Sequence, residues 1–205
     1  MFTVKIVSVR SLVRCLVASA VLASISQAQA PSEVPVFEIT PGSSTIQFNV
    51  AASVAIKGTF DKWDATLTFT SADVTTGVLD IKIQADSVDT GSGMKNGKLK
   101  GKDFFDTKKN PLITFKSTKI VQTGPDTFEA DGDFTIRGVT RPEKLTVTVS
   151  GRGTGSGAIN GTMAFDRKEY GMNSGIPFIK IADRVEVTVD LKAKRISGPP
   201  VDLKQ

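Results

Sequence analysis

Few side chains in this sequence could carry chemistry. Its 205 residues include no histidine and one cysteine, Cys15. Without histidine, a Ser-His-Asp triad, a Cys-His pair and any metal or haem site with histidine ligands are excluded. Carboxylate pairs, lysines and the single tyrosine, Tyr170, remain as catalytic candidates. We therefore expect no catalytic residues, no bound metal and no cofactor.

Two carboxylates, Asp103 and Asp106, lie three residues apart in a polar stretch. A pair of acidic groups can act as general acid and base. Aspartates in loops more often form hydrogen bonds to nearby backbone and stabilise turns. An enzyme that uses these carboxylates or Tyr170 is one hypothesis. We favour turn-forming aspartates in a protein that is not an enzyme.

The stretch around these aspartates, residues 89–111, is rich in lysine. A short amphipathic helix is expected over residues 94–100, with Leu99 and Phe104 or Phe105 covering the core. One interpretation is a solvated charged loop held down by its aromatic residues. The other is a basic rim for an anionic head group beside an apolar cavity, formed by Lys95, Lys98, Lys100 and Lys102.

Residues 1–30 have the composition of a secretory signal peptide. Three basic residues precede a short apolar run, residues 15–25, and Ala28-Gln29-Ala30 then forms an A-x-A cleavage site before Pro31. The apolar run is shorter than the roughly 20 residues that a membrane-spanning helix needs. We expect cleavage before Pro31, export, and no stable membrane anchor afterwards.

Removal of this segment changes the charge of the chain. Three of the 26 basic residues and none of the 21 acidic residues lie in it, so the mature chain carries a net charge of +2. A nearly neutral chain gives little support to nucleic acid as a partner. Cys15 is also removed, so the mature protein is expected to fold without disulfides.

Strict alternation of apolar and polar residues marks the elements that must position any site. Residues 185–194 alternate without exception, as expected for a β-strand with one buried face. Strands are predicted at residues 44–51, 62–69, 77–87, 113–121, 127–137, 143–150, 158–166 and 183–195. This spacing favours an all-β sandwich or barrel. We expect one domain over residues 35–196 and a mobile tail, residues 197–205.

Several motifs resemble the YceI-like family along nearly the whole mature chain. The central ones are Ser87-Val88-Asp89-Thr90-Gly91, Leu99, Asp103-Phe104-Phe105-Asp106 and residues 110–117 (NPLITFKS). The others are Gly58-Thr59-Phe60, residues 134–142 (FTIRGVTRP), residues 165–172 (FDRKEYGM) and residues 181–185 (IADRV). Many members carry Arg-Asp-x-His before the Asp-Phe-Phe segment, whereas this chain has Lys95-Asn96-Gly97-Lys98.

The resemblance implies an extended antiparallel, lipocalin-like β-barrel of about eight strands, with a short helical or loop insertion near residues 94–106. It also implies a bacterial periplasmic protein that holds a long isoprenoid lipid, such as a prenyl phosphate or a quinone tail, inside the barrel. The departure at residues 95–98 removes any role of the family histidine here.

A barrel of about eight strands has an interior just wide enough for side chains or one slender ligand. Alternation places ten apolar side chains on candidate inward positions, where they would either pack as an ordinary core or line the ligand site. They are Phe48, Phe69, Ile81, Ile83, Phe115, Phe128, Phe134, Val147, Val187 and Val189.

Three functions are open at this point. The favoured one is a periplasmic carrier of an isoprenoid lipid, bound by burial of its apolar chain. The second is a stress-protective or protein-interaction barrel with a filled core and no physiological ligand. The third is the enzyme considered above. A homodimer is compatible with all three.

Overall fold

Eleven strands and one α-helix form within the residues that the computed structural model describes, 33–53, 55–175 and 180–203. The helix is α1 (Gly93–Lys100). The strands are β1 (Val36–Ile39), β2 (Thr45–Ala52), β3 (Ile56–Phe60), β4 (Trp63–Thr68), β5 (Val78–Gln84), β6 (Val88–Asp89), β7 (Leu112–Gln122), β8 (Thr127–Ile136), β9 (Val139–Val149), β10 (Ser156–Asp166) and β11 (Ile181–Ser197).

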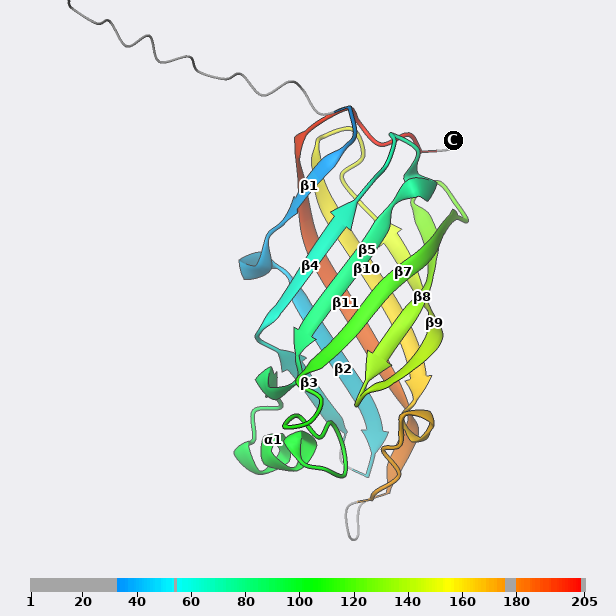
Figure 1. Cartoon of the computed structure of the whole chain (residues 1–205). Helices are drawn as coiled ribbons and strands as arrows, with labels where there is room; N and C mark the ends of the chain where they lie inside the picture. Colours follow the sequence, from blue (N-terminus) through cyan, green and yellow to red (C-terminus); the bar gives the residue numbers. More distant parts are fainter. Residues whose placement is uncertain (1–32, 54, 176–179, 204–205) are drawn as a thin grey trace, which may run out of the picture. The chain divides into compact units, whose positions relative to one another are not determined.

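All strands belong to one sheet, in the order β4-β5-β7-β8-β9-β10-β11-β2-β3-β6, and all the strand pairs are antiparallel. β11 is 17 residues long and pairs with β2 along its first part and with β1 along its last part. The sheet curls into a barrel (Figure 1). We call the end that carries β1 and the C-terminal segment the upper end, and the end that carries α1 the lower end.

The upper end of the barrel is completed by β1, which lies against β4. The rings of Phe37 on β1 and Phe69, directly after β4, are 5.8 Å apart between centroids. Side-chain packing therefore joins the β4 edge of the sheet to β1, which is hydrogen-bonded to β11. This contact joins the β4 end of the sheet order to β1, which lies off that order beside β11.

The lower end contains a tight hairpin between β8 and β9. Arg137 and Gly138 both have positive φ, 55° and 74°, as a two-residue type I′ turn requires. The Arg137 side chain donates hydrogen bonds to the carbonyls of Lys102 (2.9 Å) and Gly171. The turn thus ties the segment after α1 and the segment after β10 to the barrel.

The all-β prediction is confirmed, and each of the eight predicted strands is present. The expected count of about eight is too low, because β1, β3 and β6 were not predicted as strands. β1 and β6 have four and two residues, too few to establish a two-residue period. β3 contains Gly58, which allows the Phe48 ring to lie on its backbone: a Cβ there would be 2.5 Å from the ring.

The predicted helix is present as α1, and the residues expected to cover the core are buried. Leu99, Phe104 and Phe105 are 9, 5 and 7% exposed, so both phenylalanines reach the interior. The segment therefore closes the lower end of the barrel. No helix among the described residues is long and apolar enough to cross a bilayer.

The C-terminal segment lies against the upper end. The backbone nitrogen of Asp202 donates to the Ala72 carbonyl (2.7 Å), and the nitrogen of Val74 donates to the Asp202 carbonyl (3.4 Å). Leu203 packs against the core. The mobility expected for residues 197–205 stays a prediction. Such motion would have to break the contacts of Asp202 and Leu203.

Candidate functional site: a divided apolar barrel interior

The barrel interior has three levels, and on several long strands successive inward residues line these levels in order. On β5, Ile83 lines a lower cavity, Ile81 belongs to a packed middle layer, and Leu79 lines an upper cavity. On β11, Val187, Val189 and Ala193 follow the same order. Inward positions recur every second residue, so long strands such as β5 and β11 contribute to more than one level. The buried apolar residues of β2 and β3, in contrast, line the lower cavity alone.

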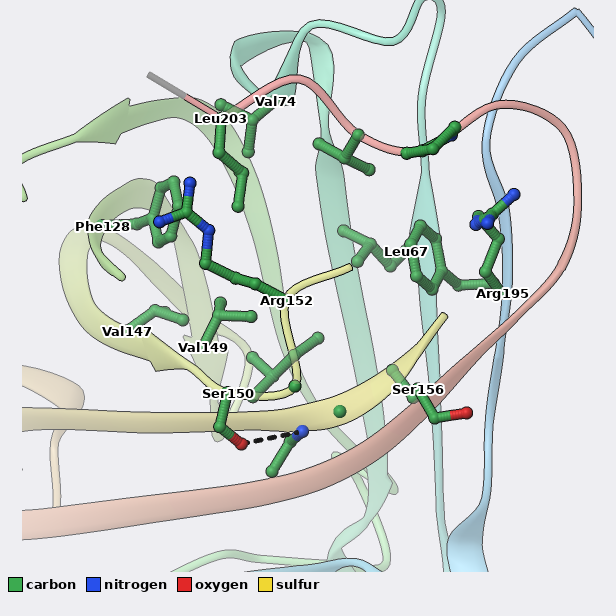
Figure 2. Close-up of a pocket in the computed structure, with 18 of the residues that line it drawn as sticks. Leu67, Val74, Phe128, Val147, Val149, Ser150, Arg152, Ser156, Arg195 and Leu203 are labelled. Atoms are coloured by element: carbon green, nitrogen blue, oxygen red, sulfur yellow. Dashed lines mark hydrogen bonds between the residues drawn. The ribbon is translucent and has the colours of Figure 1, made fainter. Parts of the chain in front are cut away.

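The upper cavity has a volume of about 180 Å³. Most of its wall is apolar and comes from strands β4, β5 and β7 to β11, with Phe37 from β1. The glycine-rich turn between β9 and β10 and the C-terminal residues Pro200, Val201 and Leu203 complete it. Figure 2 shows Leu203 and Val74 on one side of this pocket, and Val147, Val149 and Ser150 on another.

The lower cavity is smaller, about 70 Å³, and Arg167 is its only charged lining residue among those described. Phe48, Phe60 and Phe105 form an aromatic cluster in its wall. The ring centroids of Phe48 and Phe60 are 5.6 Å apart, and those of Phe60 and Phe105 are 6.0 Å apart. These distances are typical of stabilising aromatic pairs, so the cluster holds the loop after α1 on the barrel.

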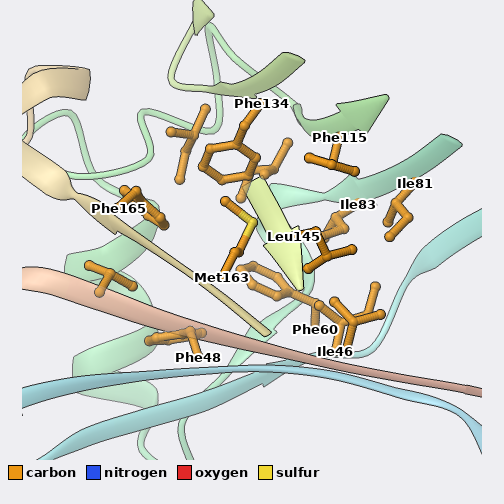
Figure 3. Close-up of a cluster of buried hydrophobic side chains, with 14 of the residues drawn as sticks. Ile46, Phe48, Phe60, Ile81, Ile83, Phe115, Phe134, Leu145, Met163 and Phe165 are labelled. Carbon is orange, nitrogen blue, oxygen red and sulfur yellow. The ribbon is translucent and has the colours of Figure 1, made fainter. Parts of the chain in front are cut away.

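A layer of buried side chains separates the two cavities. Figure 3 shows Ile81, Phe115, Leu145 and Met163 gathered in one cluster. On strands β4, β5, β7, β9, β10 and β11, the buried apolar residues that line neither cavity are Ala65, Ile81, Phe115, Leu145, Met163, Val189 and Leu191. The interior is therefore divided into two cavities by a filled middle.

All ten predicted interior residues face the barrel interior, eight of them buried and Phe69 and Val187 half-buried. Three line the upper cavity: Phe69, Phe128 and Val147. Four line the lower cavity: Phe48, Ile83, Phe134 and Val187. The other three belong to the middle layer: Ile81, Phe115 and Val189. Whether any of them contacts a ligand stays a prediction.

The predicted basic rim lies apart from both cavities, because none of Lys95, Lys98, Lys100 and Lys102 lines either one. Lys98 instead donates a 2.8 Å hydrogen bond to Asp103 and lies 5.8 Å from the centre of the Phe104 ring. The hydrogen bond from Lys98 lowers the pKa of the Asp103 carboxyl below its ordinary value of 3.8. This geometry agrees with the interpretation of the stretch as a solvated charged loop.

Two arginines line the upper cavity and were not among the predicted site residues. Arg195 faces inward because it continues the alternation of β11 after Ala193, a signal that the sequence contained. Arg152 lies in the glycine-rich turn between β9 and β10, where no periodic pattern indicates its direction. In the view of Figure 2 the two side chains flank the pocket.

The residues considered for catalysis have structural contacts. The Asp106 carbonyl accepts hydrogen bonds from the nitrogens of Lys109 and Asn110 (both 2.9 Å), as in a turn. The Tyr170 side chain is fully buried, and its hydroxyl donates to Glu143 (2.8 Å). Burial, followed by this hydrogen bond, raises the pKa of Tyr170 above its ordinary value of 10.0. A neutral, buried hydroxyl is a poor nucleophile.

Arg167 joins three carbonyls at the lower end. The residue is 6% exposed. Its guanidinium donates hydrogen bonds to the carbonyls of Ala182 (3.1 Å), Ser174 (3.0 Å) and Met172, and to the Asp183 carboxylate (3.1 Å). Lys168 also bonds Asp183, and this bond is the first cause of the lowered pKa of that carboxyl. The arginine thus holds the chain between β10 and β11 through four hydrogen bonds.

No group of three or more histidine, cysteine, aspartate or glutamate residues in the described ranges is placed to hold a metal ion. Metal independence stays a prediction that elemental analysis of the purified protein can check.

These features define an antiparallel β-barrel protein with a divided, apolar interior. The YceI-like domain matches residues 37–193, which is most of the chain, and the protein belongs to the YceI-like family. Among its relatives is the UPF0312 protein of Pseudomonas savastanoi pv. phaseolicola, 29% identical over 133 residues, 62% of this chain and 69% of the relative.

Solved structures show the same fold. The crystal structure of Burkholderia cenocepacia BcnA matches with a TM-score of 0.69 and 26% identity, over 76% of this chain and 99% of that one. A polyisoprenoid binding domain from Saccharophagus degradans, implicated in plant cell wall breakdown, matches with a TM-score of 0.62 and 15% identity, over 78% of this chain and 99% of that one.

Proposed function

We propose that this protein is exported to the periplasm, where it binds and carries an isoprenoid lipid whose apolar chain enters the barrel. The observation that carries the proposal is the upper cavity, an apolar space of about 180 Å³ between the strands and the C-terminal segment. Each buried CH₂ group contributes about 0.8 kcal/mol to binding without any catalytic group. The polyisoprenoid binding domain that shares the fold supports this choice of ligand.

The size of the cavity limits what it can hold. An apolar cavity of about 150 Å³ binds benzene, so the upper cavity has room for roughly one five-carbon isoprene unit in this conformation. A longer chain must displace the middle layer to reach the lower cavity. The proposal therefore includes a rearrangement of that layer when a long chain binds, and its free-energy cost reduces the apparent affinity.

The filled middle layer also favours a second candidate, a barrel that serves as a protein-interaction or stress-protective module without a physiological ligand. In that case the core would be closed for stability alone, and the two cavities would be packing defects. The two candidates differ in whether apolar chains bind at all and in whether affinity depends on chain length.

The test is calorimetric titration with prenyl alcohols of 10, 15 and 20 carbons at low and high salt. Binding in the barrel is expected to strengthen with chain length and to resist salt, because apolar burial is not screened. Val149, the last residue of β9, is half-buried and lines the upper cavity. Val149→Phe should fill part of this cavity and weaken binding at least tenfold. Thr148→Phe, on the exposed outer face, is the matched control.

Retention of affinity by Val149→Phe, or affinity without dependence on chain length, would count against a ligand in the barrel. Absence of binding by all three alcohols would favour the second candidate.

A further inference from the structure

The upper mouth of the barrel combines an apolar cavity with two cations. Arg152 and Arg195 are the only charged side chains among the described residues that line it, and the rest of the wall is apolar, glycine or serine. In contrast, Arg167 in the lower cavity already bonds three carbonyls and a carboxylate. Of the two cavities described, the upper one therefore joins an apolar space to cationic groups that can receive a ligand.

Arg195 is held in place from two sides. Its backbone nitrogen donates to the Gly155 carbonyl (2.7 Å), and its Nη1 donates to the carbonyl of Gly198. It stands opposite Phe37 in the β1–β11 pair, and the Phe37 ring lines the same cavity. The guanidinium is thus a half-buried, positioned cation at the point where the cavity wall meets the C-terminal segment.

Arg152 is held more loosely. Its Nη1 lies 3.4 Å from Oδ1 of Asp126, and its side chain is 37% exposed. Oδ1 of Asp126 is buried and accepts no hydrogen bond within the described part of the chain. This long contact restrains Arg152 near the mouth, but a better acceptor can draw the guanidinium away because an exposed ion pair is worth little.

We infer that the upper mouth binds the anionic head of an amphipathic ligand. The phosphate or carboxylate is held by Arg152 and Arg195, and its apolar chain points down into the cavity. This inference rests on the proposed function and deepens it by giving the bound lipid a polar end and a direction. Guanidinium groups suit this role because their planar donors match the oxygens of phosphate and carboxylate.

The same geometry makes Asp126 a competitor of the ligand head for Arg152. Removing its charge should release Arg152 and strengthen binding of an anion, while a neutral ligand should be unaffected. The lysines after β6 should not contribute, because none of them lines the cavity.

The test measures the affinities of farnesol, farnesyl phosphate and dodecanoate by calorimetry in the folded, full-length mature protein. The wild type should bind farnesyl phosphate about tenfold or more tightly than farnesol, as expected for charge-assisted hydrogen bonds. Arg152→Gln/Arg195→Gln should remove this preference and leave farnesol affinity within about twofold. Asp126→Asn should increase the preference for farnesyl phosphate over farnesol. Lys194→Gln, next to Arg195 on the exposed outer face, is the matched control.

Comparison of dodecanoate with farnesyl phosphate shows which anionic head the site prefers. With either anion, a preference over farnesol that is lost in the double variant supports the inference. Equal affinity for farnesol and both anions, or a preference that survives the double variant, overturns it while leaving the proposed function intact. Failure of all three probes to bind overturns both. Thermal unfolding of each variant checks that the barrel remains folded.

Discussion

Leu145 on β9 lies directly on the backbone of Gly161 on β10. A Cβ at Gly161 would be 3.1 Å from Cδ1 of Leu145, closer than ordinary van der Waals contact. Leu145 is 1% exposed and belongs to the layer between the cavities. The glycine thus allows a large side chain to fill the middle of the barrel, and Leu145 is one of the buried residues that separate the two cavities.

Leu145→Ala should open the middle layer. We expect the free energy of unfolding to fall by about 2–5 kcal/mol, the usual cost of truncating a buried leucine. Affinity for a 20-carbon prenyl alcohol should rise relative to a 10-carbon one, because the longer chain no longer has to displace Leu145. Urea denaturation and calorimetry measure the two effects, and Thr146→Ala on the exposed face is the control. Equal changes for both alcohols would contradict a dividing role for Leu145.

Phe105→Ala should strongly destabilise the protein although the residue lies outside regular secondary structure. Its ring contacts Phe48 and Phe60 at centroid distances of 6.5 and 6.0 Å. Loss of a buried phenylalanine costs about 3–5 kcal/mol. Met94→Ala, a truncation of a side chain that is 88% exposed on α1, should leave the urea midpoint unchanged. A wild-type midpoint for Phe105→Ala would show that this loop does not close the barrel.

Tyr170 should remain protonated in the folded protein well above pH 10. Its pKa is raised in the folded state, so its contribution to stability is complete below the ordinary value of 10.0 and declines as pH rises above that value. Because Tyr170 is the only tyrosine, the tyrosinate absorbance reports on it alone. We expect this absorbance to appear only together with alkaline unfolding, followed by circular dichroism. Ionisation near pH 10 with the fold intact would contradict the buried contact with Glu143.

The exported protein should begin at Pro31. The basic residues, the apolar run and Ala28-Gln29-Ala30 motivate this expectation, and residues 1–30 lie outside the described structure. Amino-terminal sequencing of periplasmic material from the host measures it directly. A mature chain that retains Cys15 would refute both cleavage and the charge of +2 derived from it.

The sequence alone predicted the face of each residue better than its level in the barrel. Alternation along one strand shows that Ile81 and Ile83 point inward, but the cavity or layer that each reaches depends on neighbouring strands. The layer that divides the interior depends on contacts across strands, such as Leu145 against Gly161, which no single-strand period encodes. Arg195 could have been found from its inward position, whereas Arg152 follows a glycine in an irregular turn.

An isoprenoid chain bound inside the barrel should co-purify with the protein. Lipid extracted from protein purified from its native host, identified by mass spectrometry, tests this. We expect a prenyl lipid in the wild-type protein and in Lys116→Glu, whose new charge lies on the exposed face. Folded Phe115→Glu, whose new charge lies in the middle layer, should carry none. Wild-type protein that carries no prenyl lipid, or a folded Phe115→Glu variant that carries as much as wild type, would contradict binding inside the barrel.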